Sequence, residues 1–199
     1  MSKKLPSILF LFSCLFCTTV FAADPPPLSL MKNVSSQLLT TLRTHKRQIQ
    51  DRRVIDNIVN RILVPHFDLP GASRSVVGRN HWYQASKSTR GQFIKAFTKY
   101  VIDMYSSALS SYSDEVITFK PMRNYSASQT RVLIYSVVRR SGAKPINLNY
   151  RLIKLGNIWK IYDFSVDGVS MVQNYRAQFR EPLNKGGLAE LTRQLQSRE

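Results

Sequence analysis

The chain has 199 residues, 43% of them hydrophobic, and a formal net charge of +17. This length favours one folded domain over two, and the basic charge favours encounters with anionic surfaces and partners. A Gly-rich phosphate loop and a dinucleotide-binding fingerprint are both absent from the sequence, which argues against nucleotide-driven chemistry.

The start of the chain has the layout of a secretory signal peptide. Two lysines precede an apolar run over residues 5–20, and small side chains surround a cleavage site after Ala22. A membrane anchor that stays in place is the alternative, but the apolar run is shorter than a full membrane span. We therefore expect residues 1–22 to be a cleaved signal and residues 23–199 to form one domain.

Removal of this segment would change the chemistry available to the chain. Cys14 and Cys17 both lie within it, so the mature protein would have no thiol and no disulfide. Lys3 and Lys4 would leave as well, which lowers the formal net charge from +17 to +15. In an exported protein such a charge favours phospholipid headgroups and lipopolysaccharide over nucleic acid as anionic partners.

Apolar residues three and four apart predict helices in the first half of the chain. An extended leader is expected at the prolines of positions 25–27, because proline has a fixed φ and lacks an N–H. Three amphipathic segments follow, at residues 31–42, 54–63 and 72–77. Proline at position 65 ends the second of these, and Gly78 ends the third.

The longest predicted helix begins at a cap at Ser86 or Thr89 and continues to about Tyr112. Its two neighbouring apolar stripes contain Phe93, Ile94, Phe97, Tyr100, Val101, Met104, Tyr105, Ala108, Leu109 and Tyr112. Together the stripes are wider than a helix needs to lie on a protein surface. We therefore expect this helix to be largely enclosed.

Beyond position 113 the apolar period changes to two, which predicts strands. The predicted strands are residues 116–120, 131–140, 146–154 and 158–167. In the third of them Leu148, Tyr150 and Leu152 alternate with Asn149 and Arg151. This alternation indicates a sheet with one apolar face and one wet face.

A glycine corner at Gly168 separates the last strand from a C-terminal helix. Apolar side chains recur at helical intervals over residues 171–179, and a last short helix is expected over residues 188–195. The predicted fold is α+β: a twisted antiparallel sheet of about four strands, wrapped by N- and C-terminal helices. Such a cone-like arrangement often keeps an apolar cavity between sheet and helices.

Residues suited to catalysis or metal binding are few. His45, His66 and His81 stand in three separate segments without the spacing of metal ligands, so the sequence predicts no metal and no cofactor. Asp163 or Asp103, in an apolar cavity beside a tyrosine, could act as a general base in a cone-shaped isomerase or hydrolase. For Asp163 at a strand end, bonding to nearby backbone amides is the favoured interpretation, and no catalytic residue is assigned.

Two segments carry a specific resemblance to a known family: residues 159–163, Trp-Lys-Ile-Tyr-Asp, and residues 167–176, Asp-Gly-Val-Ser-Met-Val-Gln-Asn-Tyr-Arg. The chain resembles the MlaC family of periplasmic phospholipid-binding proteins, also known as toluene-tolerance proteins, from about Leu30 to Leu195. The resemblance implies a carrier in the periplasm that encloses acyl tails between a sheet and helices. It implies three partners: an inner-membrane ABC transporter, an outer-membrane lipoprotein–porin complex and, transiently, the membrane surface. The process that the resemblance implies is the maintenance of lipid asymmetry in the outer membrane.

The side chains expected to contact lipid come from the helices and from the apolar sheet face. They are Val76, Phe93, Phe97, Tyr100, Met104, Leu148, Tyr150, Leu152, Met171, Val172 and Tyr175. Flexible methionines suit a cavity that accepts varied tails. Two alternatives stay open: a cone-fold enzyme that uses an aspartate in the cavity, and a structural envelope adaptor whose own side chains fill the space.

Overall fold

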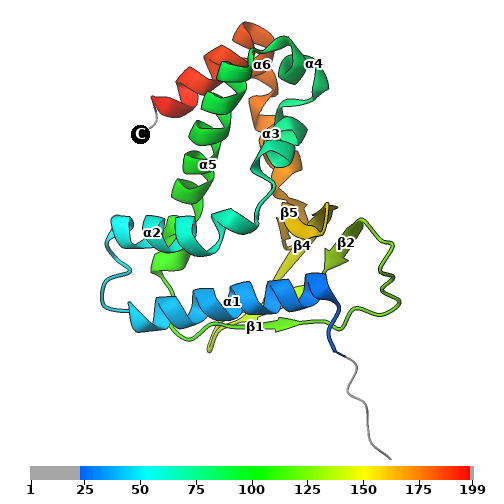
Figure 1. Ribbon diagram of the computed structural model, residues 1–199. Helices are drawn as coiled ribbons and strands as arrows, with labels where there is room; N and C mark the ends of the chain where they lie inside the picture. The colour runs from blue at the N-terminus through cyan, green and yellow to red at the C-terminus, as the bar shows by residue number, and fades with distance from the viewer. Residues whose placement is uncertain (1–22, 198–199) are drawn as a thin grey trace, which may run out of the picture.

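The computed structural model describes residues 23–197, in which helices surround one side of an open antiparallel sheet (Figure 1). The predicted signal peptide, residues 1–22, lies outside the described residues. The helices are α1 (Pro26–Thr44), α2 (Arg52–Ile62), the 3-10 helix η1 (Val64–His66), α3 (Leu69–Val77), α4 (Arg79–Gln84), α5 (Lys87–Ser110) and α6 (Met171–Gln196). The strands are β1 (Val116–Phe119), β2 (Arg131–Ile134), β3 (Ser136–Arg139), β4 (Ile146–Leu155), β5 (Ile158–Val166) and β6 (Val169–Ser170). The predicted α+β class is confirmed.

The sheet is built around β4. Its strand order is β1-β3-β4-β5-β6, and β2 pairs with β4 beside β3. The predicted strand over residues 131–140 is therefore two strands, which separate at Tyr135. The first of them pairs with the second half of β4, with Ile134 opposite Tyr150, and the second pairs with its start, with Val138 opposite Ile146.

A β-bulge in β5 sets which side chains face the helices. Arg151 pairs with Asp163, but Leu152 pairs with Ile161, so Tyr162 is the extra residue. A bulge of this kind lets residues three apart lie on the same face of the sheet. Ile161 and Phe164 consequently both face inward.

Two helix starts differ in how well the sequence predicts them. The extended leader expected at the prolines is wrong, because α1 begins at Pro26. Proline is tolerated in the first turn, where its missing N–H would have no partner in the helix. The cap of α5 is confirmed as Ser86, whose hydroxyl accepts a hydrogen bond from the Thr89 N–H at 3.0 Å.

The two predicted C-terminal helices are both present within α6, where a break at Gly187 separates them. Ser170 caps the start of α6 by accepting a hydrogen bond from the Gln173 N–H at 3.2 Å. At Gly187 the backbone leaves the helical region, with φ of 67° and ψ of −163°. Only glycine adopts such a conformation without strain, so this position sets the change in helix direction.

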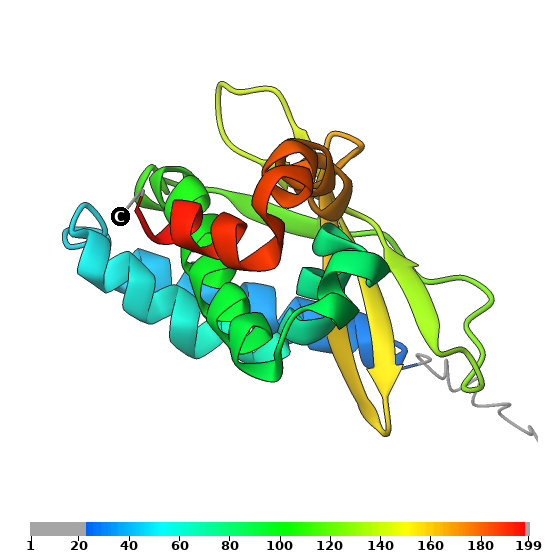
Figure 2. The ribbon, with the colours of Figure 1, turned by 90° about the horizontal axis from the view of Figure 1, so that it is seen from above.

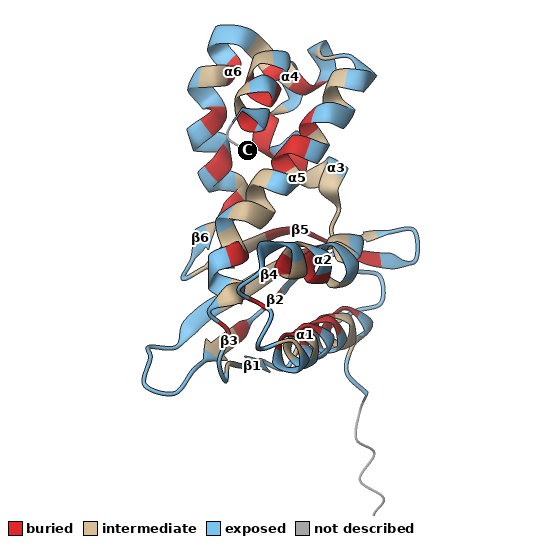
Figure 3. Ribbon diagram, turned by 90° about the vertical axis from the view of Figure 1, so that its left-hand side faces the viewer, coloured by how far each residue is buried: buried red, intermediate tan, exposed pale blue. Residues whose placement is uncertain are grey.

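Apolar packing divides into three clusters of buried side chains. The α6 cluster is Val76, Val77, Trp82, Phe93, Ala96, Phe97, Met171, Tyr175, Phe179, Leu183, Leu188, Leu191 and Leu195. The α2 cluster is Leu38, Leu42, Ile49, Ile55, Ile58, Val59 and Tyr112. The sheet cluster is Leu28, Met31, Ile134, Leu152, Trp159 and Ile161. Figure 3 shows the buried positions gathered in the upper helices and along the side of α1 that faces the sheet.

The long helix α5 connects these regions. It packs against α3 and α6 near its start and against α2 near its end (Figures 1 and 2). The helix therefore connects the group formed by α3 and α6 with α2. Within residues 23–197, no helix combines the length and apolar character that crossing a bilayer requires.

Candidate functional site

A cavity of about 580 Å³, partly open to solvent, lies where the three clusters meet. This volume is within the range of about 300–1,000 Å³ typical of ligand pockets. Its wall contains side chains from α1, α2, η1, α3, α5, α6 and the strands β1, β3, β4 and β5. The sheet and the helices therefore do not close completely on each other.

The helical side of the cavity comes chiefly from α1 and α5. On α1 the lining side chains Met31, Ser35, Leu38 and Leu42 lie three and four residues apart, so they share one face. On α5 the lining side chains come from both apolar stripes and from two residues beside them, Thr98 and Ile102. The full set on α5 is Phe97, Thr98, Val101, Ile102, Tyr105, Ala108 and Leu109.

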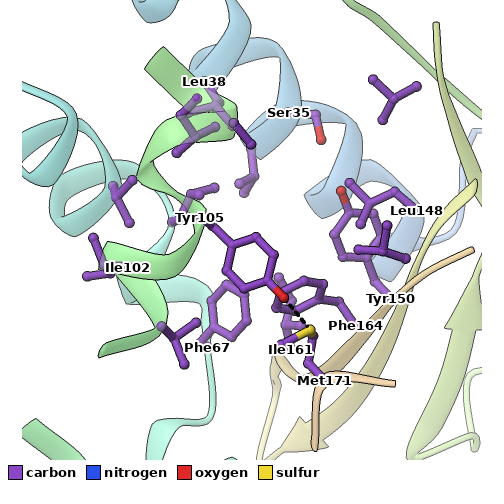
Figure 4. A pocket seen from close by; sticks show the side chains of 18 of the residues that line it. Ser35, Leu38, Phe67, Ile102, Tyr105, Leu148, Tyr150, Ile161, Phe164 and Met171 are labelled. Atoms are coloured by element: carbon purple, nitrogen blue, oxygen red, sulfur yellow. Dashed lines mark hydrogen bonds between the residues drawn. The ribbon is translucent and has the colours of Figure 1, made fainter. Parts of the chain in front are cut away.

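The sheet side comes from the inward-facing residues of β4 and β5. Leu148 and Tyr150 project from β4, and Ile161 and Phe164 project from β5, into the same space (Figure 4). Leu148 and Tyr150 face the cavity because side chains alternate along β4, and Ile161 and Phe164 both face it because of the bulge in β5. The predicted apolar face of the sheet is thus the floor of the cavity.

Tyr105 extends from α5 toward α6 (Figure 4). Its hydroxyl donates a hydrogen bond to the Met171 sulfur at 2.6 Å, and its ring meets Phe164 edge-to-face at 5.6 Å. Burial raises the pKa of the Tyr105 phenol, and burial beside other tyrosines also raises the pKa of Tyr175. Both phenols are therefore neutral at physiological pH, and this part of the wall carries no charge.

Tyr150 is another polar side chain in the wall. Burial raises the pKa of its phenol, against the opposing effect of side-chain hydrogen bonds with Ser136 and Ser35. Figure 4 shows the Ser35 and Tyr150 hydroxyls directed toward one another. The polar end of Tyr150 therefore lies beside another polar group of the wall, where the two hydroxyls can satisfy each other.

Asp163 holds the corner between β5 and α6. The residue is 6% exposed, and its carboxylate accepts hydrogen bonds from Arg151 Nη1 at 2.9 Å, Ser170 Oγ at 2.7 Å and the Val172 N–H at 3.1 Å. An aspartate bonded in this way at a helix start stabilises the helix. These contacts agree with the structural interpretation of Asp163 over the catalytic one.

Asp103 lies away from the cavity, on the face of α5 that meets α2. It forms ion pairs with Arg52 and with Lys99, the latter at 3.2 Å, and it is not among the lining residues. Among residues 23–197, no group of three or more His, Cys, Asp or Glu side chains could hold a metal ion. Asp163 and Asp103, the two carboxylates that the enzyme hypothesis invokes, are both engaged by cationic partners, so neither has the dry, unpaired position that it requires.

Six of the eleven side chains expected to contact lipid line the cavity. They are Phe97, Leu148, Tyr150, Met171, Val172 and Tyr175. The other five do not line it. Val76, Phe93 and Leu152 are completely buried in packed clusters, Tyr100 packs against the rings of Tyr175 and Phe179, and Met104 is 55% exposed. Whether any of the eleven contacts a lipid stays a prediction.

Several lining residues that were not predicted to contact lipid nevertheless belong to the apolar patterns from which the helices were predicted. Leu38 belongs to the amphipathic face of the first predicted helix, and Tyr105 and Leu109 belong to the two neighbouring apolar stripes of the long helix. The unusual width of the apolar surface on the long helix could have indicated Tyr105 and Leu109, because the part of that surface not used for packing faces the cavity. Phe164 gave no such signal, because its inward direction depends on the bulge.

Three comparisons relate this structure to known proteins. The family model described as "MlaC protein" matches residues 32–197. The intermembrane phospholipid transport system binding protein MlaC of Haemophilus influenzae is 27% identical over 199 residues, covering 98% of this chain and 92% of that protein. The toluene tolerance protein ttg2D of Pseudomonas putida is 24% identical over 181 residues, covering 90% and 82%.

A solved structure is similar in fold as well. It is the phospholipid-binding protein from Ralstonia solanacearum in complex with a phospholipid, with a TM-score of 0.81 and 27% sequence identity. The similarity covers 88% of this chain and 97% of that one.

Proposed function

Because the chain belongs to the MlaC family, we propose that it is a phospholipid carrier that encloses the acyl tails of its ligand in the cavity between sheet and helices. The observation that carries this proposal is the nearly uncharged lining: only Glu115, Arg140, Lys144 and Asp163 among the lining residues have a formal charge. The related protein from Ralstonia solanacearum, which shares this fold, was solved with a phospholipid.

The energetics of carrying a lipid through water require such a cavity. Moving one methylene from an apolar environment into water costs about 0.8 kcal/mol, so two tails with roughly thirty methylenes would cost about 24 kcal/mol if carried bare. A surface groove that covered half of them would still leave about 12 kcal/mol uncompensated. A carrier therefore has to enclose nearly all of both tails, which a cavity between two layers can do and an exposed patch cannot.

The setting of this carrier is the second part of the proposal. Residues 1–22 would direct export and be removed, and residues 23–199 would act as one carrier domain in the periplasm. There the protein would exchange phospholipid between an outer-membrane lipoprotein–porin complex and an inner-membrane ABC transporter. The name of the Haemophilus influenzae relative, which places it in an intermembrane phospholipid transport system, supports this setting.

The proposal includes no catalytic activity. Asp163 is engaged by three hydrogen-bond donors, and Asp103 pairs with cations outside the cavity. The curated relatives are named for binding, transport and tolerance, and not for a reaction. The chain would supply a compartment for lipid, and the transporter would supply the energy.

Lipid extraction tests the function directly. We expect the mature protein, purified from the periplasm without detergent, to contain phospholipid by native mass spectrometry and by thin-layer chromatography of an organic extract. After delipidation it should take up phospholipid again from vesicles. Protein that is consistently free of lipid, and that takes none from vesicles, would show that the proposal is wrong.

A further inference from the structure

Three of the four charged lining residues gather at one place. Glu115 precedes β1, Arg140 follows β3, and Lys144 lies in the loop between β3 and β4. The pairing of β1 with β3 brings the first two together, with Arg140 Nη1 3.6 Å from Glu115 Oε1. A hydrogen bond of 3.3 Å from the Ala143 N–H to the Arg140 carbonyl closes the loop that carries Lys144.

This place is a mouth of the cavity. The Arg140 side chain is 45% exposed, whereas the neighbouring lining residues Ile117 and Val138 are half-buried. Figure 3 shows the loop after β3 projecting beyond the edge of the sheet, with exposed residues. Because long basic side chains keep their charged ends in water while their stems cover apolar surface, they mark where the apolar interior meets solvent.

The two cations differ in how they are held. Arg140 is oriented by Glu115, whose other carboxylate oxygen accepts a hydrogen bond from the Ser113 N–H at 2.8 Å. A guanidinium has five N–H donors in a planar fork, so one ion pair leaves donors for a second anion. Lys144 makes no ion pair with any of the described residues. The mouth thus has one excess positive charge over Glu115.

We propose that Arg140 and Lys144 form a binding site for the phosphate group of the lipid whose tails fill the cavity. This inference rests on the proposed function and goes beyond it, because it assigns the position of the headgroup and a chemical preference. A phosphodiester carries one negative charge directly beside the two ester-linked tails, so tails in the cavity place it at the mouth. The pair recognises the phosphate itself, and it favours phospholipids over neutral lipids with the same tails.

The test compares two lipids that differ only at the headgroup. Delipidated mature protein is incubated with vesicles that contain dioleoyl phosphatidylglycerol and dioleoylglycerol in equal amounts, and both bound lipids are counted by native mass spectrometry. We expect the phospholipid to be preferred about fivefold, as for two partly exposed ion pairs. In the Arg140→Ala/Lys144→Ala variant the ratio should fall close to one, because the phospholipid loses its advantage and dioleoylglycerol occupies a larger share of the protein.

A matched control separates this site from the overall charge of the protein. Arg123 and Arg139 are exposed and do not line the cavity, so the Arg123→Ala/Arg139→Ala variant loses the same charge elsewhere and should keep the ratio. Glu115→Gln removes the competing carboxylate and should raise the ratio. If the Arg140→Ala/Lys144→Ala variant keeps the preference, or if the control variant loses it equally, the assignment of the site is wrong.

Two further results distinguish the possible failures. Wild-type protein that takes up neither lipid would refute the proposed function itself, whereas equal uptake of both would refute only the phosphate site. Calorimetric titration with inorganic phosphate and with glycerol phosphate forms the last arm. Binding of either as tight as that of the phospholipid would indicate a free-phosphate site and overturn the assignment to a headgroup, and weak or absent binding supports it.

Discussion

A glutamate at position 148 gives the most direct test of the cavity. Leu148 is half-buried on the inner face of β4 and lines the cavity, and Leu155 is on the same strand, 44% exposed and outside the lining. In the empty protein the introduced carboxylate can stay hydrated, because the cavity is partly open. We therefore expect Leu148→Glu to fold and to lose affinity for lipid, while Leu155→Glu should bind lipid as wild type does.

The size of the loss follows from proton binding. Acyl tails exclude water, so the carboxylate has to become neutral before lipid can cover it. For a glutamate with an ordinary pKa of about 4.3, protonation at pH 7 costs about 3.7 kcal/mol, which corresponds to roughly a five-hundredfold weaker affinity. At pH 5 the same step costs about 1 kcal/mol, so the affinity should be only about fivefold weaker.

Vesicle uptake at pH 5, 6 and 7 measures this directly, with circular dichroism to show that the variant is folded. Leu148→Gln is the uncharged comparison, and its affinity should not depend on pH in this range. Full lipid uptake by Leu148→Glu at pH 7 would mean that the tails do not reach β4. An equal loss at pH 5 and pH 7 would mean that the substitution acts through structure and not through charge.

Three further variants test other parts of the structure. Asp163→Asn leaves Arg151 with a weaker partner and should lower the free energy of unfolding in urea by about 2–3 kcal/mol; an unchanged value would exclude a structural role for this carboxylate. Tyr105→Ala removes a ring from the cavity wall and should increase the bound mass or the preferred tail length in native mass spectrometry, whereas an unchanged lipid profile would show that this ring does not limit the space. Phe93→Ala should cost about 3–5 kcal/mol in the same urea assay because the side chain is fully buried, and Met104→Ala should change stability by less than about 0.5 kcal/mol; similar values for both would contradict their placement.

The sequence predicts the strands well because a sheet with one wet face leaves a period of two. Leu148 and Tyr150 are on the predicted face for this reason. The break at Tyr135 and the bulge at Tyr162 leave no such trace, since each depends on which partner strand is opposite. The local pattern of one strand contains no information about its neighbour's register.

The candidate site is harder to predict than the fold, and α5 shows why. Phe93 and Tyr105 are both apolar-stripe residues of this helix, yet the first is completely buried and the second is half-buried and lines the cavity. The difference is set by the elements opposite each of them: α6 packs closely on the first half of α5, while the second half faces the sheet across open space. An apolar side chain is suited both to a packed core and to the wall of a ligand cavity, so residue type alone does not distinguish the two.

The division of the core into three clusters explains how the protein can be both stable and able to empty. Most of the fully buried side chains, such as Phe93 and Leu152, pack within a cluster and do not depend on what fills the cavity. The cavity in turn has only to be about as apolar as the bilayer interior. A tail that moves between two such environments changes its free energy little in either direction. The Tyr105 hydroxyl, which bonds to Met171, and the Tyr150 hydroxyl, which faces Ser35, preserve that match, since an unpaired polar group would favour water over tails. A lining of this kind suits exchange of lipid with two membranes better than a tighter site would, because the lipid must leave as readily as it enters.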